Sequence, residues 1–391
     1  MLLSGIHTTT ETLDSRFRGN DVIRVFQLSQ IMKFNIYVLY PFDSGLELDF
    51  KGRAADEFFK SMSSKKTSVN VVSHEAASRF APSVESTTAV YKFGVGVTQL
   101  KLSVECEMKD LADLSFAVEN VRIGKTRLED YARSVAEGVM HRARKLAVYR
   151  YEMRLPDVEI FPIFTAEEPL SDDAARFIER NNRVIFGILS GEREYDRLSA
   201  YVLEQEKLVN YGYYENEIIL IKRFGAFVAS SDASAVAEMI KLALAQYWSL
   251  KSYNFIMDKE LDTAQMLLGS MPPYYKFWRM PSAYHRFSAE AIDFDRDKIS
   301  IVDSLYNVMI NIPRVEADWH LGTIHKNVNK VFDINGLYET VGTKIERIEE
   351  SYNAARDYLS TNFFILLDII FFLSLAWSVF DTILLFTIAK K

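Results

Sequence analysis

The sequence predicts an α+β protein with an antiparallel-sheet head domain, long helices that form a stalk, and a single C-terminal transmembrane helix. Three observations favour this fold class. Apolar and polar residues alternate along Gln99–Met108, which is the period of a strand with one buried face. Apolar residues recur at helical spacing along Leu337–Leu359. The 27 residues of Phe363–Ala389 contain no Lys, Arg, Gly or Pro.

Residues 1–31 lack the apolar core of a secretory signal peptide. Within them, Leu13–Asp21 resembles the translated form of dispersed palindromic repeats in some bacterial genomes. A strand-like run then opens at Met32. We therefore expect residues 1–31 to be a disordered or spurious leader and the biological start to be Met32, which N-terminal sequencing of the native protein would test.

Residues 32–232 are expected to form the α+β head, with short, mostly antiparallel strands and helices laid on one side of the sheet. Expected strands are Val90–Val97, Gln99–Met108, Ala147–Arg154, Val158–Phe164, Val184–Leu189 and a pair within Ile218–Ser230 that turns near Arg223–Gly225. Expected helices are Thr126–Leu146, Ser171–Arg180 with Ser171 as N-cap, and Arg193–Leu208.

Two features of the head could suggest chemistry, and both have a structural interpretation. Cys106 falls on the apolar side of Gln99–Met108, so we expect a small core residue rather than a nucleophile. Gly94 and Gly96 indicate a bulge or a close backbone approach, because the third glycine and the helix of a phosphate-binding loop are missing.

Residues 233–336 are expected to form a helical domain. Ser231 and Asp232 would cap a helix from Ala233 to about Leu268. From Asp293 to Thr361 the pattern is almost wholly helical, with interruptions expected at Pro313, Gly322, Gly336 and Gly342.

Residues 337–362 are expected to be a stalk. Their apolar seam has spacings of four, four, three, four, three and four and consists of Leu337, Val341, Ile345, Ile348, Tyr352, Ala355 and Leu359. Such a seam suits either the core face of a helical hairpin, which we favour, or a parallel coiled coil between copies. Because no linker follows, stalk and membrane helix should form one rod.

Residues 363–389 would span about 40 Å as a helix, more than the ~30 Å hydrocarbon core of a bilayer. Only two lysines follow, which predicts a tail-anchored, single-pass protein. Positive charges on the two sides of the segment barely discriminate its orientation. The single cysteine favours a reducing compartment, so we expect the soluble part to be cytoplasmic and the membrane to be a bacterial inner membrane.

The apolar run contains polar residues that are costly in a bilayer unless they face protein or water. Ser374, Ser378 and Asp381 share one helical face with Thr382 beside them, and Asp368 could sit near the entry interface. One interpretation is a helix–helix contact between copies. The alternatives are a path for ions or protons, or an interfacial aspartate without a role.

Met271–Phe287 combines aromatic residues, cations and prolines and contains no acid. The residues of interest are Tyr274, Tyr275, Lys276, Trp278, Arg279 and Arg286. This composition suits a packing loop between helices, a contact with a membrane surface or a protein partner, or base stacking. The formal net charge of −7 argues against nucleic acid as a general partner.

Motifs for catalysis or cofactor binding are missing from the sequence. No P-loop, Rossmann fingerprint, Gly-x-Ser-x-Gly elbow or His-Glu-x-x-His occurs, and no two of the six histidines stand three or four residues apart. One cysteine forms no intrachain disulfide and no cysteine cluster for zinc or iron–sulfur. We therefore name no catalytic, cofactor-binding or metal residue and expect no enzyme activity.

Short segments resemble the "required for meiotic nuclear division" family. They are Phe93–Val97, with its aromatic-Gly-x-Gly character, and Ala243–Gln246 followed by Leu250 and Tyr253. The resemblance covers roughly Tyr91 to the C-terminus. It departs from the family at Lys241-Leu242, where the family has Ser-His, and in the missing Leu-Glu pair before Phe363. It implies a non-enzymatic, oligomeric, membrane-anchored scaffold and carries over no catalytic residues.

The sequence thus leads first to a non-enzymatic, tail-anchored scaffold or tether that forms homo-oligomers and presents its head at the membrane face. Its expected partners are the lipid bilayer, further copies of itself and a protein at the membrane. One alternative is a homo-oligomeric pore in which the C-terminal helices line an ion path. A second is a membrane-attached enzyme whose catalytic residues assemble from distant positions.

Overall fold

The computed structural model describes residues 31–62, 64–73, 79–150, 159–167, 173–310 and 319–389. Its strands are β1 (Met32–Asp43), β2 (Leu46–Leu48), β3 (Lys65–Ser68), β4 (Val71–Val72), β5 (Arg79–Val90), β6 (Val95–Cys106), β7 (Arg122–Ile123), β8 (Thr126–Arg127), β9 (Ala147–Arg150), β10 (Phe161–Ala166), β11 (Ile218–Lys222) and β12 (Gly225–Ala229). Its α-helices are α1 (Arg53–Lys60), α2 (Met108–Phe116), α3 (Leu128–Ala143), α4 (Ala174–Ser190), α5 (Ala200–Gln205), α6 (Ala233–Gly269), α7 (Met280–Ile310), α9 (Trp319–Val331) and α10 (Ile334–Ala389). The expected leader lies outside the described residues, apart from Ile31.

The predicted α+β class is confirmed. The main sheet has seven strands in the order β11-β12-β10-β1-β6-β5-β3, and β10 with β12 is its one parallel pair. The central strand β1 begins at Met32, where the sequence predicts a strand, and pairs along its full length with β6. Two small sheets, β2-β9 and β4-β7-β8, flank the main one.

The β5–β6 hairpin shows why its glycines are there. The predicted alternation along β6 is confirmed, and Cys106 is a buried core residue. Gly94 takes a positive φ of 79° in the turn before β6. A Cβ on Gly96 would stand 2.2 Å from the Phe42 ring of β1, so the expected close backbone approach is confirmed.

Helices cover both faces of the sheet, whereas the sequence suggested one covered face. One set of side chains, including Ile36 and Leu100, packs with α2, α3 and α4. The alternate set, including Leu39 and Val97, packs with α6. The expectation was wrong because the alternation of β6 indicates one buried face, whereas Gln99 on the other face is also partly covered and accepts a hydrogen bond from Lys241 of α6 at 3.3 Å.

Four predictions in the head need correction. Residues 90–97 are not one strand, because β5 ends at Val90, a turn closes between Tyr91 and Gly94, and β6 begins at Val95. The other three concern 171–208. Val184–Leu189 is not a strand but the last part of α4, because a short apolar run fits a buried helix as well as a strand. Ser171 lies outside the described residues, and Asp173 caps α4 by accepting from the backbone N–H of Ala175 at 2.9 Å. Residues 193–208 form a single 3-10 turn, η3 (Tyr195–Arg197), and the short α5 rather than one helix.

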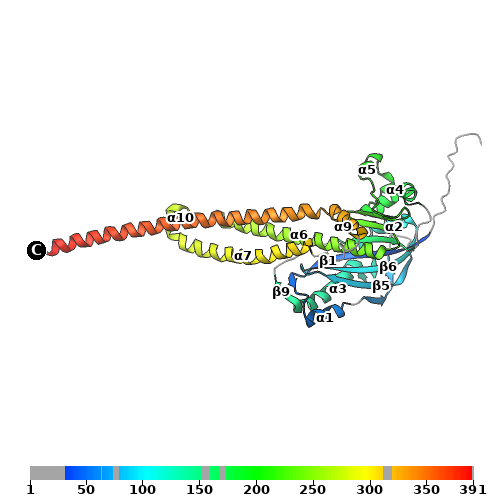
Figure 1. The fold of residues 1–391 in the computed structure, drawn as a ribbon, viewed down its shortest axis with the longest axis horizontal. Coiled ribbons are helices and arrows are strands. Elements are labelled where there is room, and N and C mark those ends of the chain that lie inside the picture. The colour runs from blue at the N-terminus through cyan, green and yellow to red at the C-terminus, as the bar shows by residue number, and fades with distance from the viewer. Residues whose placement is uncertain are drawn as a thin grey trace, which may run out of the picture. The chain divides into compact units, whose positions relative to one another are not determined.

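The helices after the head form a bundle. The predicted long helix is α6, whose first half packs on the sheet and whose second half packs against α7 and α10, so that the three run side by side (Figure 1). The glycines expected to interrupt the later helices, Gly322, Gly336 and Gly342, lie inside α9 or α10. The break falls instead at Asp333, with a φ of 50°. Pro313 lies outside the described residues.

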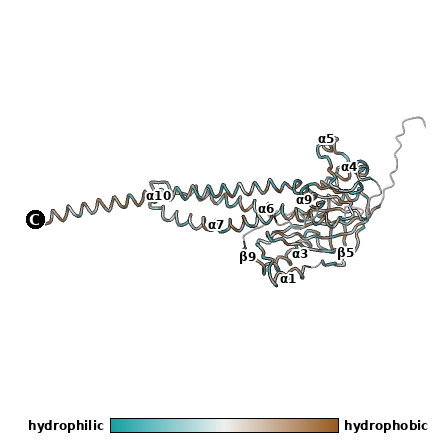
Figure 2. Tube along the Cα trace, in the orientation of Figure 1, coloured by the Kyte–Doolittle hydropathy of each residue, from teal (hydrophilic) through white to brown (hydrophobic). Residues whose placement is uncertain are grey.

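The seam of α10 packs inside its own chain. Its residues from Val341 to Leu359 are buried against α6 and α7, as the favoured hairpin interpretation expects. α10 then continues without interruption through the apolar run to Ala389, so the stalk and the apolar run form one continuous helix, as expected. Figure 2 shows the apolar character of that last part.

Candidate functional site

The last part of α10 leaves the bundle. Leu366 is its last buried residue, and every residue from 367 to 389 is exposed. Within the described part of the chain, α10 is the one helix long and apolar enough to cross a membrane. A core helix would be covered by its own chain, so this exposure leaves a large apolar surface that only another apolar environment can cover.

The polar residues of the apolar run all lie within the continuous helix α10. Ser374 donates to the carbonyl of Phe371 and Thr382 to the carbonyl of Ser378, each at 2.8 Å. Ser378, Asp381 and Asp368 are exposed like their neighbours. Two of the hydroxyls are therefore satisfied within the helix, which makes them inexpensive in a bilayer and leaves the carboxylates as the costly groups.

The aromatic and cationic segment Met271–Phe287 lies at the far end of the bundle, where α6 turns into α7 (Figure 1). The 3-10 segment η4 (Tyr274–Arg279) leads directly into α7, so the expected loop is helical from Met280 onward. Tyr275 and Trp278 are 58% and 63% exposed. The Lys276 ammonium lies 5.7 Å from the centroid of the Tyr275 ring. The side chain of Tyr274 lies outside the described ones.

Tertiary contacts fix this segment beside the start of the apolar run. The Tyr358 hydroxyl of α10 donates to the carbonyl of Pro272 at 2.9 Å. The ring of Tyr284 stacks on that of Phe363, with centroids 6.4 Å apart. Arg286 donates to the Ser270 hydroxyl at 2.8 Å. We call the six described residues of this surface the collar: Tyr275, Lys276, Trp278, Arg279, Tyr284 and Arg286.

Part of the same segment packs inside the bundle. Met280 and Phe287 are buried in the core of the bundle, while the collar side chains beside them stay outside. The segment therefore has an inner face that closes the bundle and an outer face that carries rings and positive charge. The sequence predicts the composition of that outer face, but not that it lies against Phe363.

A cleft of about 680 Å³ opens in the head between the β1–β2 turn and the C-terminal end of α3. It is lined by Asp43, Ser44, Gly45, Leu46, Glu137, Met140, His141, Arg144 and Arg150. Asp43 accepts from the Gly45 backbone N–H at 2.8 Å and from the Ser252 hydroxyl of α6 at 2.6 Å. Its carboxylate thus serves the fold, and the mixture of acids and cations around the cleft favours no single class of ligand.

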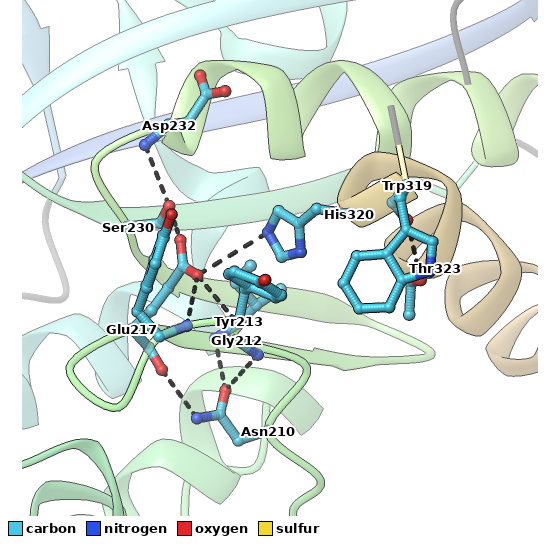
Figure 3. A network of polar contacts seen from close by, with 11 residues as sticks. Asn210, Gly212, Tyr213, Glu217, Ser230, Asp232, Trp319, His320 and Thr323 are labelled. Atoms are coloured by element: carbon cyan, nitrogen blue, oxygen red, sulfur yellow. Dashed lines mark hydrogen bonds and ion pairs between the residues drawn. The ribbon is translucent and has the colours of Figure 1, made fainter. Parts of the chain in front are cut away.

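A buried carboxylate, Glu217, joins the edge of the sheet to α9 (Figure 3). It accepts from the Tyr213 backbone N–H at 2.9 Å and from the Ser230 hydroxyl, and the His320 imidazole lies 3.8 Å away. The carboxylate stands between hydroxyl and imidazole, so the imidazole is not placed to take the hydroxyl proton, as a catalytic triad requires. The arrangement is a structural joint.

A second buried polar group lies inside the helices. The His325 side chain of α9 forms a 2.9 Å hydrogen bond with the Gln246 amide oxygen, and the Gln246 amide nitrogen donates to the carbonyl of Val308 at 2.6 Å. Burial lowers the pKa of the His325 imidazole to about 4. The imidazole is therefore neutral near pH 7, and its role in this network is packing with a specific partner.

Sequence reasoning missed the cleft and both polar networks. Glu217 and His320 are about one hundred positions apart, and no spacing rule connects them. Among the residues that the structure describes, no three His, Cys, Asp or Glu side chains are grouped as metal ligands would be.

Fold and exposed helix together define an α+β protein with one candidate membrane helix. A family model described as "Uncharacterized protein MJ0711, N-terminal domain" matches residues 38–235, just over half of the chain, and the protein belongs to that family. The match runs from β1 to the first residues of α6. No curated protein and no solved structure matches the chain.

Proposed function

We propose that the protein is a single-pass membrane protein without catalytic activity, which assembles with further copies and holds its α+β head at the membrane face as a scaffold or tether. The observation that carries the proposal is the continuity of α10. One helix is packed in the bundle up to Leu366 and then runs exposed and apolar for the rest of its length. A continuous helix transmits position, so an anchored segment would orient the bundle and the head together.

The bundle supports the stiffness that a tether needs. α6 reaches from the sheet to the level of the collar, and its outer half packs along α10. The Lys344 ammonium of α10 donates to the Asn254 side chain of α6 at 2.7 Å and pairs with Asp258 of the same helix at 2.5 Å. Arg223, in the turn between β11 and β12, ties the sheet to α6: its guanidinium lies 4.3 Å from the centroid of the Tyr247 ring. The sheet, α6 and α10 are thus linked through contacts within one chain.

Assembly of several copies is proposed from the polar face of the apolar segment. A carboxylate in the hydrocarbon core costs about 2.5–3.5 kcal/mol on insertion scales unless it faces protein or water. Contact between copies along Ser374, Ser378 and Asp381 would remove that cost. The head and bundle layout is also the one implied by the resemblance to the "required for meiotic nuclear division" family, and this relationship stays a prediction.

The experiment uses the full chain expressed in membranes. Alkaline carbonate washing should leave it in the pellet, and its mass in mild detergent should correspond to more than one copy. Asp381→Leu should keep the protein in the membrane and weaken the assembly, while Asp357→Leu, at an exposed carboxylate outside the apolar segment, should change neither. Release of the wild-type chain by the wash would contradict the anchor.

The pore alternative makes a different prediction for the same variants. Liposomes that contain a pore would conduct ions, and Asp381→Leu would change that conductance. A scaffold should produce no flux with either chain. Flux that depends on Asp381 would therefore replace the scaffold proposal with the pore.

A further inference from the structure

The collar is exposed at the point where α10 leaves the bundle. Trp278, Tyr275 and Tyr284 are 63%, 58% and 45% exposed, although large aromatic side chains are usually covered. The stacking of Tyr284 on Phe363 brings one of these rings to the first residue of the apolar run, and the Tyr358–Pro272 hydrogen bond holds the segment that carries the other two beside α10. From Tyr358, which holds the segment through Pro272, to Phe363 the helix rises only about 7.5 Å.

The charge of the collar has one sign. Lys276, Arg279 and Arg286 are its ionised groups, and residues 263–289 contain no Asp or Glu. On the neighbouring turn of α10, Asp357 is paired with Arg356 at 3.8 Å, so the two charges there offset each other. The collar itself is therefore positive, although the protein as a whole has a formal net charge of −7.

Aromatic rings and cations beside the start of an apolar helix suit contact with the headgroup region of a bilayer. Trp and Tyr rings favour the headgroup region of a bilayer, where the ring is in an apolar environment and its polar edge is hydrated. Lys and Arg near the surface gain about 1 kcal/mol each from anionic lipids. A protein partner would need a complementary surface at the same depth, whereas a bilayer that receives α10 brings headgroups within reach of the collar.

We infer that the collar binds the headgroups of anionic phospholipids in the leaflet that α10 enters. This inference rests on the proposed membrane span of α10 and adds the lipid class and the residues that recognise it. Lipid phosphates contact the cations, and the rings lie between headgroup and acyl chain.

The test reconstitutes the full chain with Ser282→Cys, an exposed position in the first turn of α7, labelled with a polarity-sensitive dye. Cys106 is buried and should remain unlabelled. Vesicles of phosphatidylcholine alone are compared with vesicles of phosphatidylcholine and phosphatidylglycerol in equal parts. We expect blue-shifted emission and stronger quenching by spin-labelled lipid in the anionic vesicles, and a smaller difference at high salt.

The second part of the experiment removes positive charges from the collar. Lys276→Gln combined with Arg279→Gln should lower the ratio of docked to undocked collar roughly thirtyfold, about fivefold for each charge. The matched control, Lys125→Gln with Lys207→Gln, removes two exposed lysines of the head and should leave the signal unchanged. A dye at Ala200→Cys in α5 should respond to neither lipid.

The outcomes separate the inference from the function on which it rests. If the chain leaves the vesicles in an alkaline wash, the proposed membrane span fails. If it stays inserted but the dye at position 282 reports the same polarity in both vesicles, the inference is overturned. The lipid comparison uses unaltered collar residues, so it decides the point even if the double variant folds poorly.

Discussion

The two halves of α10 have one continuous backbone and opposite surroundings. From Ile334 to Leu359 the helix buries a seam of apolar residues against α6 and α7 and turns charged residues outward. From 367 to 389 it buries nothing against its own chain. The first half therefore owes its position to side-chain packing, and the second half is free to take its position from an environment outside the chain.

The pattern of the sequence differs between the halves for the same reason. A helix with one packed face and one hydrated face shows a periodic apolar stripe, whereas a helix in hydrocarbon can be apolar all round. The stripe ends near Leu359, and the uniform run begins at Phe363. The contacts with the collar segment flank this interval: Tyr358 donates to the Pro272 carbonyl just before it, and Phe363 at its end stacks on Tyr284.

The largest expected effect compares the same substitution in the two halves. Ile348→Ala should lower the free energy of unfolding by about 2–5 kcal/mol, because Ile348 is fully buried in the seam and its loss leaves a cavity. Ile383→Ala, at a position 59% exposed, should change it by only a few tenths. Denaturation in mild detergent measures both. Equal losses would mean that the second half also packs on protein.

The second prediction concerns membrane retention, which should depend on the exposed half of α10 and not on the packed half. Leu375→Arg should weaken retention in the membrane by about 3 kcal/mol, because it adds a charge near the middle of the apolar segment, while the stability of the head stays unchanged. The fraction recovered in the pellet after an alkaline wash measures it. Glu339→Arg, on the exposed face of the packed half, should leave retention unchanged. Full retention of Leu375→Arg would contradict an apolar environment.

The third prediction tests a group that only the packed region can contain. The pKa of His325 falls to about 4 in the folded state, below the usual value near 6.5, because of burial. The unfolded chain therefore binds more protons between these values, so the stability from neutral His325 is present above pH 6.5 and is lost as the pH falls toward 4. The loss is at most roughly 3 kcal/mol.

His325→Gln should flatten this dependence, and denaturation curves between pH 7 and pH 4 measure it. Glu260 acts in the opposite sense: burial, with Asp297 and Glu290 adding to it, raises the pKa of its carboxyl, so its contribution to stability increases as the pH falls. The difference between variant and wild type cancels that contribution. The control His285→Gln, at an exposed position, should keep the wild-type slope.

The smallest expected effect concerns the contact of Arg223, in the β11–β12 turn of the sheet, with Tyr247 of α6. Arg223→Gln should cost about 1 kcal/mol, because the guanidinium stacks 4.3 Å from the Tyr247 ring centroid and hydrogen bonds to its hydroxyl. Arg176→Gln, at an exposed position of α4, should stay within a few tenths. Thermal unfolding of both variants measures the difference. Unchanged stability of Arg223→Gln would mean that apolar packing alone holds the sheet against α6.

Local patterns allowed much of the fold to be predicted. The alternation along β6, the close approach at Gly96, the long helix α6 and the seam of α10 each follow from residues near one another in the chain. The Val184–Leu189 strand failed because six apolar residues fit two secondary structures. The glycine breaks failed because a helix that is packed along its length tolerates the cost of about 1 kcal/mol per glycine.

The candidate site also has features that the sequence predicts and features that it does not. Composition identified the polar residues of the apolar run and the cations and rings of Met271–Phe287, since these are properties of contiguous residues. It could not place Tyr284 on Phe363, nor join Glu217 to His320, because each contact closes a loop of many residues. Such contacts depend on how helices cross, and no short-range rule specifies that.

The sequence by itself determined that this protein is α+β, that its last helix is apolar enough for a membrane, and that a cationic aromatic segment precedes it. These properties depend on side-chain hydropathy and period alone. Only the tertiary structure decided that both faces of the sheet are covered, that the seam of α10 is used within the chain, and that the collar stands at the start of the apolar run. Each of these needs surfaces from distant segments to fit together, and shape complementarity is a property of the folded chain.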